Sequence, residues 1–432
     1  MEAQKLNRMF NQLGLFSTWG YIFFSIVPHA SAGKYISSAL MLVAFLSLLL
    51  RKQIKRPEIN WLNISVFLVV GLALLSAVLT PYWADSLNQF RKEGLPFLLG
   101  FLLLTNANAV THQKTATCTM LALISGYAVK EVLAISAGAV NGFQFSIYET
   151  PDLALPKYLD FFSADTPYYL PFLLGPLLFW PMKLYQRLAL FLLAVLAIAV
   201  VVVSGVRTAF IFVVATVLLI LVYRFWSFRK TIFVALAIVM SSGYLLKDKI
   251  TDPSIARYLS IISVQTYQFG KDGSVSERYA IIKGVWEVSK DRVLLGYGPG
   301  WKKLPVVAEA NGYLDRWRHS QDPMDAWALR YFSLGEGRVN PHNFYIALVF
   351  EEGVLGLIAY ISLMFAAVAG TLKILNKNND PIQHGVAVAG ALYLMVYFGG
   401  SLAGGAWLPV TMLVTVVCIA LYQQRKPVVT SR

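Results

Sequence analysis

Long apolar runs alternate with short polar segments along almost the whole chain. Each run is close to the roughly 20 residues that an α-helix needs to cross a bilayer. The pattern predicts an all-α polytopic membrane protein with about 12 transmembrane helices, near residues 11–29, 35–50, 61–79, 95–110, 116–138, 168–181, 188–205, 208–223, 231–246, 353–372, 383–399 and 406–422. The run at 168–181 is short and holds three prolines (Pro171, Pro176 and Pro181), so we expect a broken or kinked helix there.

A single long polar segment, residues 247–342, interrupts this alternation, and a smaller loop is expected at 139–167. The long segment contains 14 basic residues, 11 acidic residues and four tryptophans. Because it is too apolar and aromatic for a disordered linker, we expect a helical cap that lies on the membrane. The chain therefore divides into N-terminal transmembrane helices (1–246), a large loop outside the membrane (247–342) and C-terminal transmembrane helices (343–432).

Two local patterns organise the predicted cap. Residues Ser274–Glu277 form a capping-box pattern that opens a helix. The apolar positions of this helix share one side, namely Ile281, Ile282, Val285, Trp286 and Val288. The run Gly296-Tyr297-Gly298-Pro299-Gly300 then breaks the chain sharply.

The composition, with 57% hydrophobic and 14% charged residues, is typical of an integral membrane protein. The formal net charge of +14 does not indicate nucleic-acid binding, because the basic residues gather on one side of the predicted membrane. About 17 lie in the segments on the side of both termini, whereas about five lie in the short loops opposite. This asymmetry predicts cytoplasmic termini and places residues 247–342 outside.

His342 is the candidate catalytic residue. It follows Pro341 at the mouth of a predicted membrane helix on the outside face, at the end of the long polar segment. An imidazole at the boundary between water and a dry cavity suits a general base with a pKa near neutral. The alternative is an interfacial histidine that is hydrogen-bonded to a loop carbonyl.

Three arginines are candidate ligands for a phosphate. Arg207 interrupts a long apolar run at a turn, where a guanidinium needs an anion or water. Arg278 lies in the first turn of the predicted capped helix, where an anion bound to free N–H groups would balance its charge. Arg91, in a short outside loop, adds positive potential. The alternatives are a distant ion pair or snorkelling for Arg207, pairing with Glu277 or Asp272 for Arg278, and lipid headgroups for Arg91.

Four other charged residues occur in apolar surroundings. Lys130 and Glu131 fall inside a predicted span, where mutual structural pairing is favoured over a functional role. Glu351 and Glu352 follow His342 by about nine residues, and they could pair with the arginines or orient the site.

The outside loops lack the motifs of several other chemistries. They contain no Asp-x-Asp pair, no His-x-x-x-His pair and no carboxylate cluster, so we expect no metal. The chain also lacks a Walker-type phosphate loop, so we expect no ATP and no other cofactor.

The candidate residues belong to motifs that follow a characteristic order. These are Arg207 at a turn, Ser276-Glu277-Arg278 followed by Trp286, Leu294-Leu295-Gly296-Tyr297-Gly298-Pro299-Gly300, and Pro341-His342-Asn343-Phe344-Tyr345 leading into Glu351-Glu352-Gly353-Val354-Leu355-Gly356-Leu357. In this order, over roughly residues 200–360, the chain resembles the bacterial O-antigen ligase (WaaL-like) and O-antigen polymerase (Wzy-like) superfamily. The resemblance implies a GT-C-like fold in the bacterial inner membrane, with a periplasmic loop over the active site.

The resemblance also implies a glycosyltransferase activity without metal or cofactor. The donor is a glycan on undecaprenyl diphosphate, and the acceptor of a ligase is a sugar hydroxyl of lipid A–core. The family's functional residues map onto Arg207, Arg278 and His342. The arginines would neutralise the diphosphate, and His342 would take the proton of the acceptor hydroxyl, whose attack inverts the anomeric configuration.

Several related activities share these motifs. We favour an O-antigen ligase because of the near-twelve spans and the single large late loop. The alternatives are a Wzy-type O-antigen or exopolysaccharide polymerase and a protein O-oligosaccharyltransferase. A transporter fits less well, because the charged residues gather at the outer mouth instead of spreading through several spans.

Overall fold

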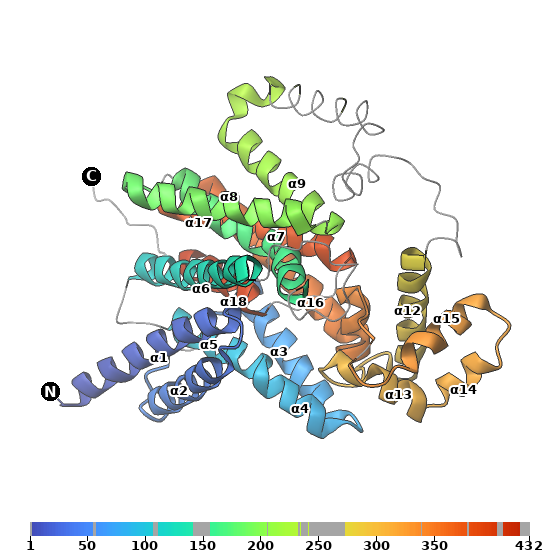
Figure 1. The fold of residues 1–432 in the computed structure, drawn as a ribbon. Helices are drawn as coiled ribbons and strands as arrows, with labels where there is room; N and C mark the ends of the chain where they lie inside the picture. The colour runs from blue at the N-terminus through green and yellow to red at the C-terminus, as the bar shows by residue number, and fades with distance from the viewer. Residues whose placement is uncertain are drawn as a thin grey trace.

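The structure is a computed structural model that describes residues 2–54, 58–106, 111–140, 156–204, 206–231, 234, 241, 273–337, 339–377, 380–403 and 409–423. Within these residues the chain is helical and contains no strand. It forms a helical bundle with a smaller group of helices at one end, whereas the N-terminal end of α1 lies at the opposite end (Figure 1).

The bundle contains long helices from both halves of the chain. They are α1 (Glu2–Ile26), α2 (Ser31–Leu50), α3 (Trp61–Leu79), α5 (Gly94–Thr105), α6 (His112–Val140), α7 (Pro156–Phe179), α8 (Leu184–Ser204), α9 (Arg207–Arg224), α16 (Phe344–Lys377), α17 (Pro381–Ala403) and α18 (Pro409–Gln423). The short helix α4 (Trp83–Lys92) connects α3 to α5. Helix α16 packs against α3 from the first half of the chain and against α17 from the second.

Seven described helices are long and apolar enough to cross a membrane: α2, α3, α6, α8, α9, α16 and α17. They coincide with seven of the 12 predicted spans, which confirms an all-helical polytopic membrane protein. The predicted spans 11–29, 95–110, 168–181 and 406–422 fall in α1, α5, α7 and α18, none of which is among the seven. The predicted span 231–246 lies outside the described residues except for single positions.

Helix α7 differs from its prediction. Instead of a short broken helix at 168–181, the structure has a 24-residue helix with Pro167, Pro171 and Pro176 inside it. The prediction of a loop over 139–167 is wrong for residues 156–167, which form the first half of this helix. Prolines are tolerated in membrane helices because neighbouring helices cover the freed carbonyl groups, and α7 packs against α8, α9 and α17.

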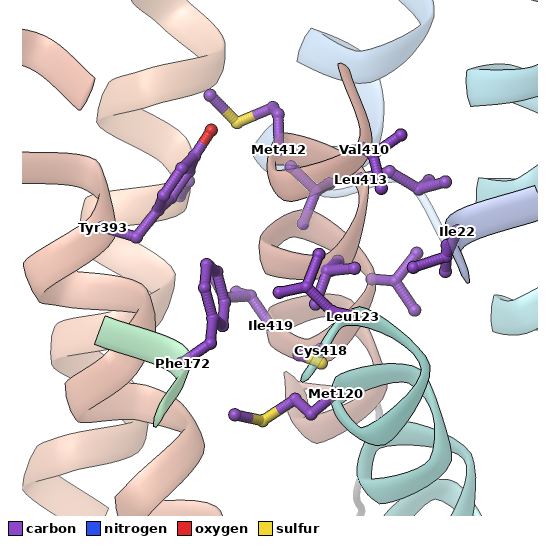
Figure 2. Close-up of a cluster of buried hydrophobic side chains, with 14 of the residues drawn as sticks. Ile22, Met120, Leu123, Phe172, Tyr393, Val410, Met412, Leu413, Cys418 and Ile419 are labelled. Atoms are coloured by element: carbon purple, nitrogen blue, oxygen red, sulfur yellow. The ribbon is translucent and has the colours of Figure 1, made fainter. Parts of the chain in front are cut away.

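Helix α18 lies at the centre of the bundle. Every residue from Val410 to Tyr422 is buried. Figure 2 shows its side chain Ile419 between Leu123 of α6 and Phe172 of α7. A 15-residue helix that is apolar on all sides is therefore covered by protein all round.

The helices at the end of the bundle form the predicted cap. They are α12 (Gly273–Ser289), α13 (Leu304–Ala310), α14 (Tyr313–Arg318) and α15 (Pro323–Phe332). They enclose a small hydrophobic core of their own, in which Val285, Trp317 and Phe332 are at most 1% exposed. Phe350 of α16 completes this core, so the first turns of α16 anchor the cap to the bundle. Helices are confirmed in this segment within residues 273–337; residues 247–272 and 338 lie outside the described part, and the position of the cap on the membrane stays a prediction.

The helix predicted from the capping box has its apolar side largely as expected. Ile281, Val285 and Val288 are buried in the cap core. Trp286 was predicted on the same side, but it is 40% exposed. At 100° per residue Trp286 lies beside Val285 and not above it, which places its ring on the flank of the helix.

Candidate active site

A cavity of about 690 Å³ lies where the bundle meets the cap. Its walls come from α3, the α4–α5 junction, α7, α9, α12, residues 299–301 and the start of α16. Within the described chain, six acidic, basic or imidazole side chains line it: Glu93, Asp165, Arg278, His342, Glu351 and Glu352. Residues from all parts of the chain therefore meet in one space.

His342 is held in an uncommon backbone conformation immediately before α16. Its φ of 51° lies in the left-handed region, which side chains other than glycine adopt rarely and at a cost of about 1–2 kcal/mol. Its N–H donates to Asn340 Oδ1 over 3.0 Å. The next residue, Asn343, caps α16 by accepting from Ile346 N over 3.1 Å. The proline, the two asparagines and the helix start together fix the position of the imidazole.

The surroundings of His342 keep its imidazole neutral. Burial and the nearby positive charge of Arg278 lower the pKa of His342 below its usual value of 6.5, and Glu277 opposes them. A neutral imidazole has a lone pair that can accept a proton at neutral pH. The side chain can therefore act as a base.

Arg278 lines the same cavity from α12. The helix begins at Gly273, earlier than predicted, so Arg278 lies in its second turn and not in its first. The expected anion site between Arg278 and the free N–H groups of the first turn is weakened accordingly. Arg278 forms no ion pair with any carboxylate in the described ranges, from which Asp272 is missing. Its guanidinium therefore remains available to an anion in the cavity.

Arg207 lies next to the cavity but does not line it. It is the first residue of α9, after the short turn that follows Ser204, and its side chain is exposed. Its neighbours Val206 and Thr208 are both part of the cavity wall. Helix α8 ends at Ser204 and α9 begins at Arg207, so the two spans follow each other closely, as predicted, with Arg207 at the start of the second.

Arg91 does not line the cavity. It is exposed on α4, and its Nη2 donates to Asn88 Oδ1 over 2.9 Å. Gln89, Phe90 and Glu93, on either side of it in sequence, do line the cavity. The structure therefore brings Arg278 and His342 together, places Arg207 beside them and leaves Arg91 on an outer face.

A glycine-rich loop fixes the wall between cap and bundle. The N–H of Tyr297 donates to the Phe350 carbonyl, and that of Gly298 donates to the Glu351 carbonyl, each over 2.7 Å. Helix α16 is interrupted at this point, because Gly353 has φ 72° and ψ −173°. The interruption lets the N–H of Val354 donate to the Val293 carbonyl over 2.8 Å. The glycine motif at Gly296–Gly300 and the one around Gly353 thus pack against each other.

Glu351 adds side-chain hydrogen bonds to this contact. Its Oε1 accepts from the N–H groups of Gly300 and Trp301, over 3.0 Å and 2.6 Å. Lys303 lies on the far side of the same loop and donates to Ser86 Oγ and to the Pro299 carbonyl, each over 2.7 Å. Burial lowers the pKa of Lys303 to about 8, against the opposing effect of Glu351. Of the two roles considered for Glu351, the structure supports orientation of the site.

The predicted pairing of Lys130 with Glu131 does not form. Lys130 Nζ binds Asp165 Oδ2 over 2.8 Å, so the acidic partner comes from α7 instead of from the same helix. Glu131 is fully buried, and both of its oxygens lack a hydrogen-bond partner.

Sequence reasoning missed two of the lining acids, Glu93 and Asp165. Glu93 is the residue between α4 and α5, and burial raises its pKa while Lys34 opposes this. Asp165 occupies a helix where a loop was predicted. Both acids are charged residues next to an apolar run. This pattern was the sequence signal that could have identified them.

The described residues offer no recognisable metal centre. No group of three or more His, Cys, Asp or Glu side chains among them is placed to hold a metal ion.

The fold and the cavity define a polytopic membrane protein whose helical cap covers a cavity lined by the neutral imidazole of His342 and by the guanidinium of Arg278, which forms no ion pair within the described part of the chain. Residues 192–361 match the family model described as O-antigen ligase, which supports the resemblance of this part of the chain to the O-antigen ligase and polymerase superfamily. The matched segment includes Arg207, Arg278 and His342, whereas Glu93 and Asp165 precede it. A search of curated proteins found no match.

Proposed function

We propose that the chain is an O-antigen ligase, which transfers a glycan from undecaprenyl diphosphate to a sugar hydroxyl of lipid A–core. One observation carries the proposal: a half-buried imidazole with a lowered pKa and an unpaired guanidinium line the same cavity, at the end of a membrane bundle. The family match supports a lipid-linked glycan as the substrate class.

The reaction needs a base for the incoming alcohol. In our proposal, His342 accepts the proton of the acceptor hydroxyl as its oxygen attacks the anomeric carbon. The bond from that carbon to the diphosphate oxygen breaks on the opposite face, so the configuration inverts and undecaprenyl diphosphate leaves. General-base help of this kind typically contributes about 10²–10⁴-fold in rate.

The leaving group needs positive charge, since its own negative charge grows as the bond breaks. Arg278 in the wall and Arg207 beside it are suited to bind the diphosphate, because a guanidinium matches phosphate oxygens with two parallel hydrogen bonds. Groups that are fixed in place beforehand stabilise the transition state more than the ground state. Arg91, whose Nη2 binds Asn88 and which does not line the cavity, is assigned only a contribution to the positive potential.

The proposal includes a setting for the reaction. The cap and the cavity lie in the periplasm, both termini lie in the cytoplasm, and the fold is of the GT-C type in the inner membrane. In this proposal the arginines supply the positive charge that a divalent ion would otherwise supply to the diphosphate. The loops that the sequence places outside lack a metal-binding motif, so the reaction is proposed to be metal-independent.

A polymerase of the Wzy type is the second candidate, because the matched family covers both activities. The two reactions differ only in the acceptor, which is a second lipid-linked glycan for the polymerase. The cavity residues named above would serve both.

Reconstitution with defined substrates tests the proposal. The purified protein is placed in liposomes with undecaprenyl-diphosphate glycan and lipid A–core, in EDTA and without ATP. We expect glycan attached to lipid A–core together with free undecaprenyl diphosphate. Longer glycan on undecaprenyl diphosphate, formed equally without lipid A–core, would identify a polymerase, and the absence of any transfer would refute both activities.

A further inference from the structure

The wall of the cavity contains three glutamates whose surroundings differ. Glu351 accepts two backbone hydrogen bonds. Glu93 interacts with Gln89 and with the positive charges of Lys34, Lys92 and Lys302. Glu352 is only 8% exposed, and its Oε2 is buried without a hydrogen-bond partner. The first two carboxylates are satisfied by the protein itself, and the third is not.

The backbone makes specific room for the Glu352 side chain. A Cβ added to Gly356, one helical turn further along α16, would overlap the Cβ of Glu352 and lie 2.9 Å from its Oε2. Glycine at 356 therefore lets the carboxylate lie along the helix. Together with the backbone break at Gly353, this arrangement places Glu352 in the cavity wall.

A buried carboxylate without a partner destabilises the fold, and one that lines a cavity can gain its partner from a ligand bound there. Lys303, whose charge interacts with the neighbouring Glu351, is already bound to Ser86 and Pro299. The described residues form no three-ligand metal group around it. The remaining partner is a ligand group that donates a hydrogen bond.

We propose that Glu352 is a sugar-recognition residue, which accepts a hydrogen bond from a hydroxyl or amide N–H of the sugar attached to the diphosphate. This inference rests on the proposed function and deepens it. A cavity of about 690 Å³ is in the range that holds a ligand of roughly drug size, so it admits the diphosphate and the adjoining sugar and not a long glycan. Trp301 and Tyr168 in the same wall provide aromatic surface for the ring.

The test compares two ligands that differ only in the sugar. Binding of undecaprenyl diphosphate and of its glycan-bearing form is measured on the full chain in nanodiscs. In the wild type, the glycan form should bind more tightly. In Glu352→Leu, this sugar-dependent gain should fall by about 10-fold to 100-fold, whereas the affinity for undecaprenyl diphosphate itself should stay unchanged.

A matched control is provided by Glu131, a second buried carboxylate without partners, which lies outside the cavity wall. Both Glu131→Leu and Glu352→Leu should raise the melting temperature of the ligand-free protein, because each removes an unsatisfied buried group. Only Glu352→Leu should lose the sugar-dependent gain. Glu352→Gln provides a second variant. It keeps one acceptor oxygen at similar volume, so it should lose less of the sugar-dependent gain in affinity.

The outcomes separate the two proposals. If the wild type binds neither ligand, the proposed function fails and the sugar role of Glu352 fails with it. If the wild type prefers the glycan form and both Glu352 variants keep that preference in full, the inference about Glu352 is wrong and the proposed function stands. A lower melting temperature for both Glu352 variants, with the preference kept, would identify a purely structural carboxylate.

Discussion

At the scale of single residues, His342 combines backbone strain with a lowered pKa. The left-handed φ of 51° persists because Asn340 and the start of α16 hold the residue in place. The lowered pKa follows from burial and from Arg278 across the cavity. Strain at a residue of this type is found mostly at functional sites, where neighbouring structure fixes it.

The pH dependence of kcat/KM tests the role of this pair. A base must be neutral to act, so the rate falls as the pH falls through its pKa. Because the pKa of His342 is lowered, we expect this fall below pH 6.5 in the wild type. Arg278→Gln removes one cause of the lowering, so the fall should move to higher pH.

The matched control is Arg318→Gln, which changes a surface arginine that is paired with Asp315. It should leave the position of the fall unchanged. A profile that is the same for wild type and Arg278→Gln would contradict the electrostatic contact between Arg278 and His342.

The sequence predicted part of this site. His342, Arg278 and Arg207 were found by their positions at the ends of apolar runs, and two of them share the cavity. The role of Glu351 was not predictable, because its partners Gly300 and Trp301 are about 50 residues away in sequence. Asp165 was missed for the same reason, since its partner Lys130 lies on another helix.

At the scale of elements, the contact between the glycine-rich loop and α16 is the feature that positions the site. Ser76 of α3 donates to the carbonyls of Leu295 and Glu351, and Thr80 donates to the Tyr297 carbonyl over 2.7 Å. Three segments far apart in the chain are joined here through backbone groups. The glycines and the proline predicted the break at Gly296–Gly300, but they carry no information on the segment that the break would meet.

Gly353→Ala should disrupt this contact. At φ 72° and ψ −173° the backbone region is available essentially to glycine alone, and an added Cβ would overlap the backbone of Leu294. Strain of about 1–3 kcal/mol plus this overlap should lower the melting temperature strongly and abolish activity. Thermal unfolding in detergent measures the change.

Gly312→Ala is the matched control. Gly312 also has a positive φ, 73°, but nothing lies within 4 Å of an added Cβ. It should cost only the backbone strain, about 1–2 kcal/mol. Equal shifts in melting temperature for the two variants would show that the loop does not press against α16 as described.

At the scale of the whole molecule, the cap and the beginning of α1 lie at opposite ends of the bundle (Figure 1). The asymmetry of basic residues predicts which end is cytoplasmic, because Lys and Arg are retained on that side during insertion. Hydropathy predicted most of the helices, because the apolar character of a membrane span is a local property of the sequence. It did not recover the length of α7, because the prolines hid a helix that its neighbours stabilise.

Cysteine labelling tests this orientation. In a background without Cys118 and Cys418, Ser320→Cys on the exposed surface of α14–α15 should react with an impermeant maleimide from the periplasm. Gln53→Cys, exposed after α2, should react only after the inner membrane is opened. The reverse pattern would place the cavity in the cytoplasm.

Turnover by His342→Ala tests the central claim, that a fixed imidazole activates an alcohol toward a glycan held by arginines in one cavity. The variant is reconstituted with undecaprenyl-diphosphate glycan and lipid A–core, and its turnover is compared with that of the wild type at equal donor binding. We predict a turnover about 10²–10⁴-fold lower, with donor affinity retained. Turnover equal to that of the wild type would show that His342 is not the base.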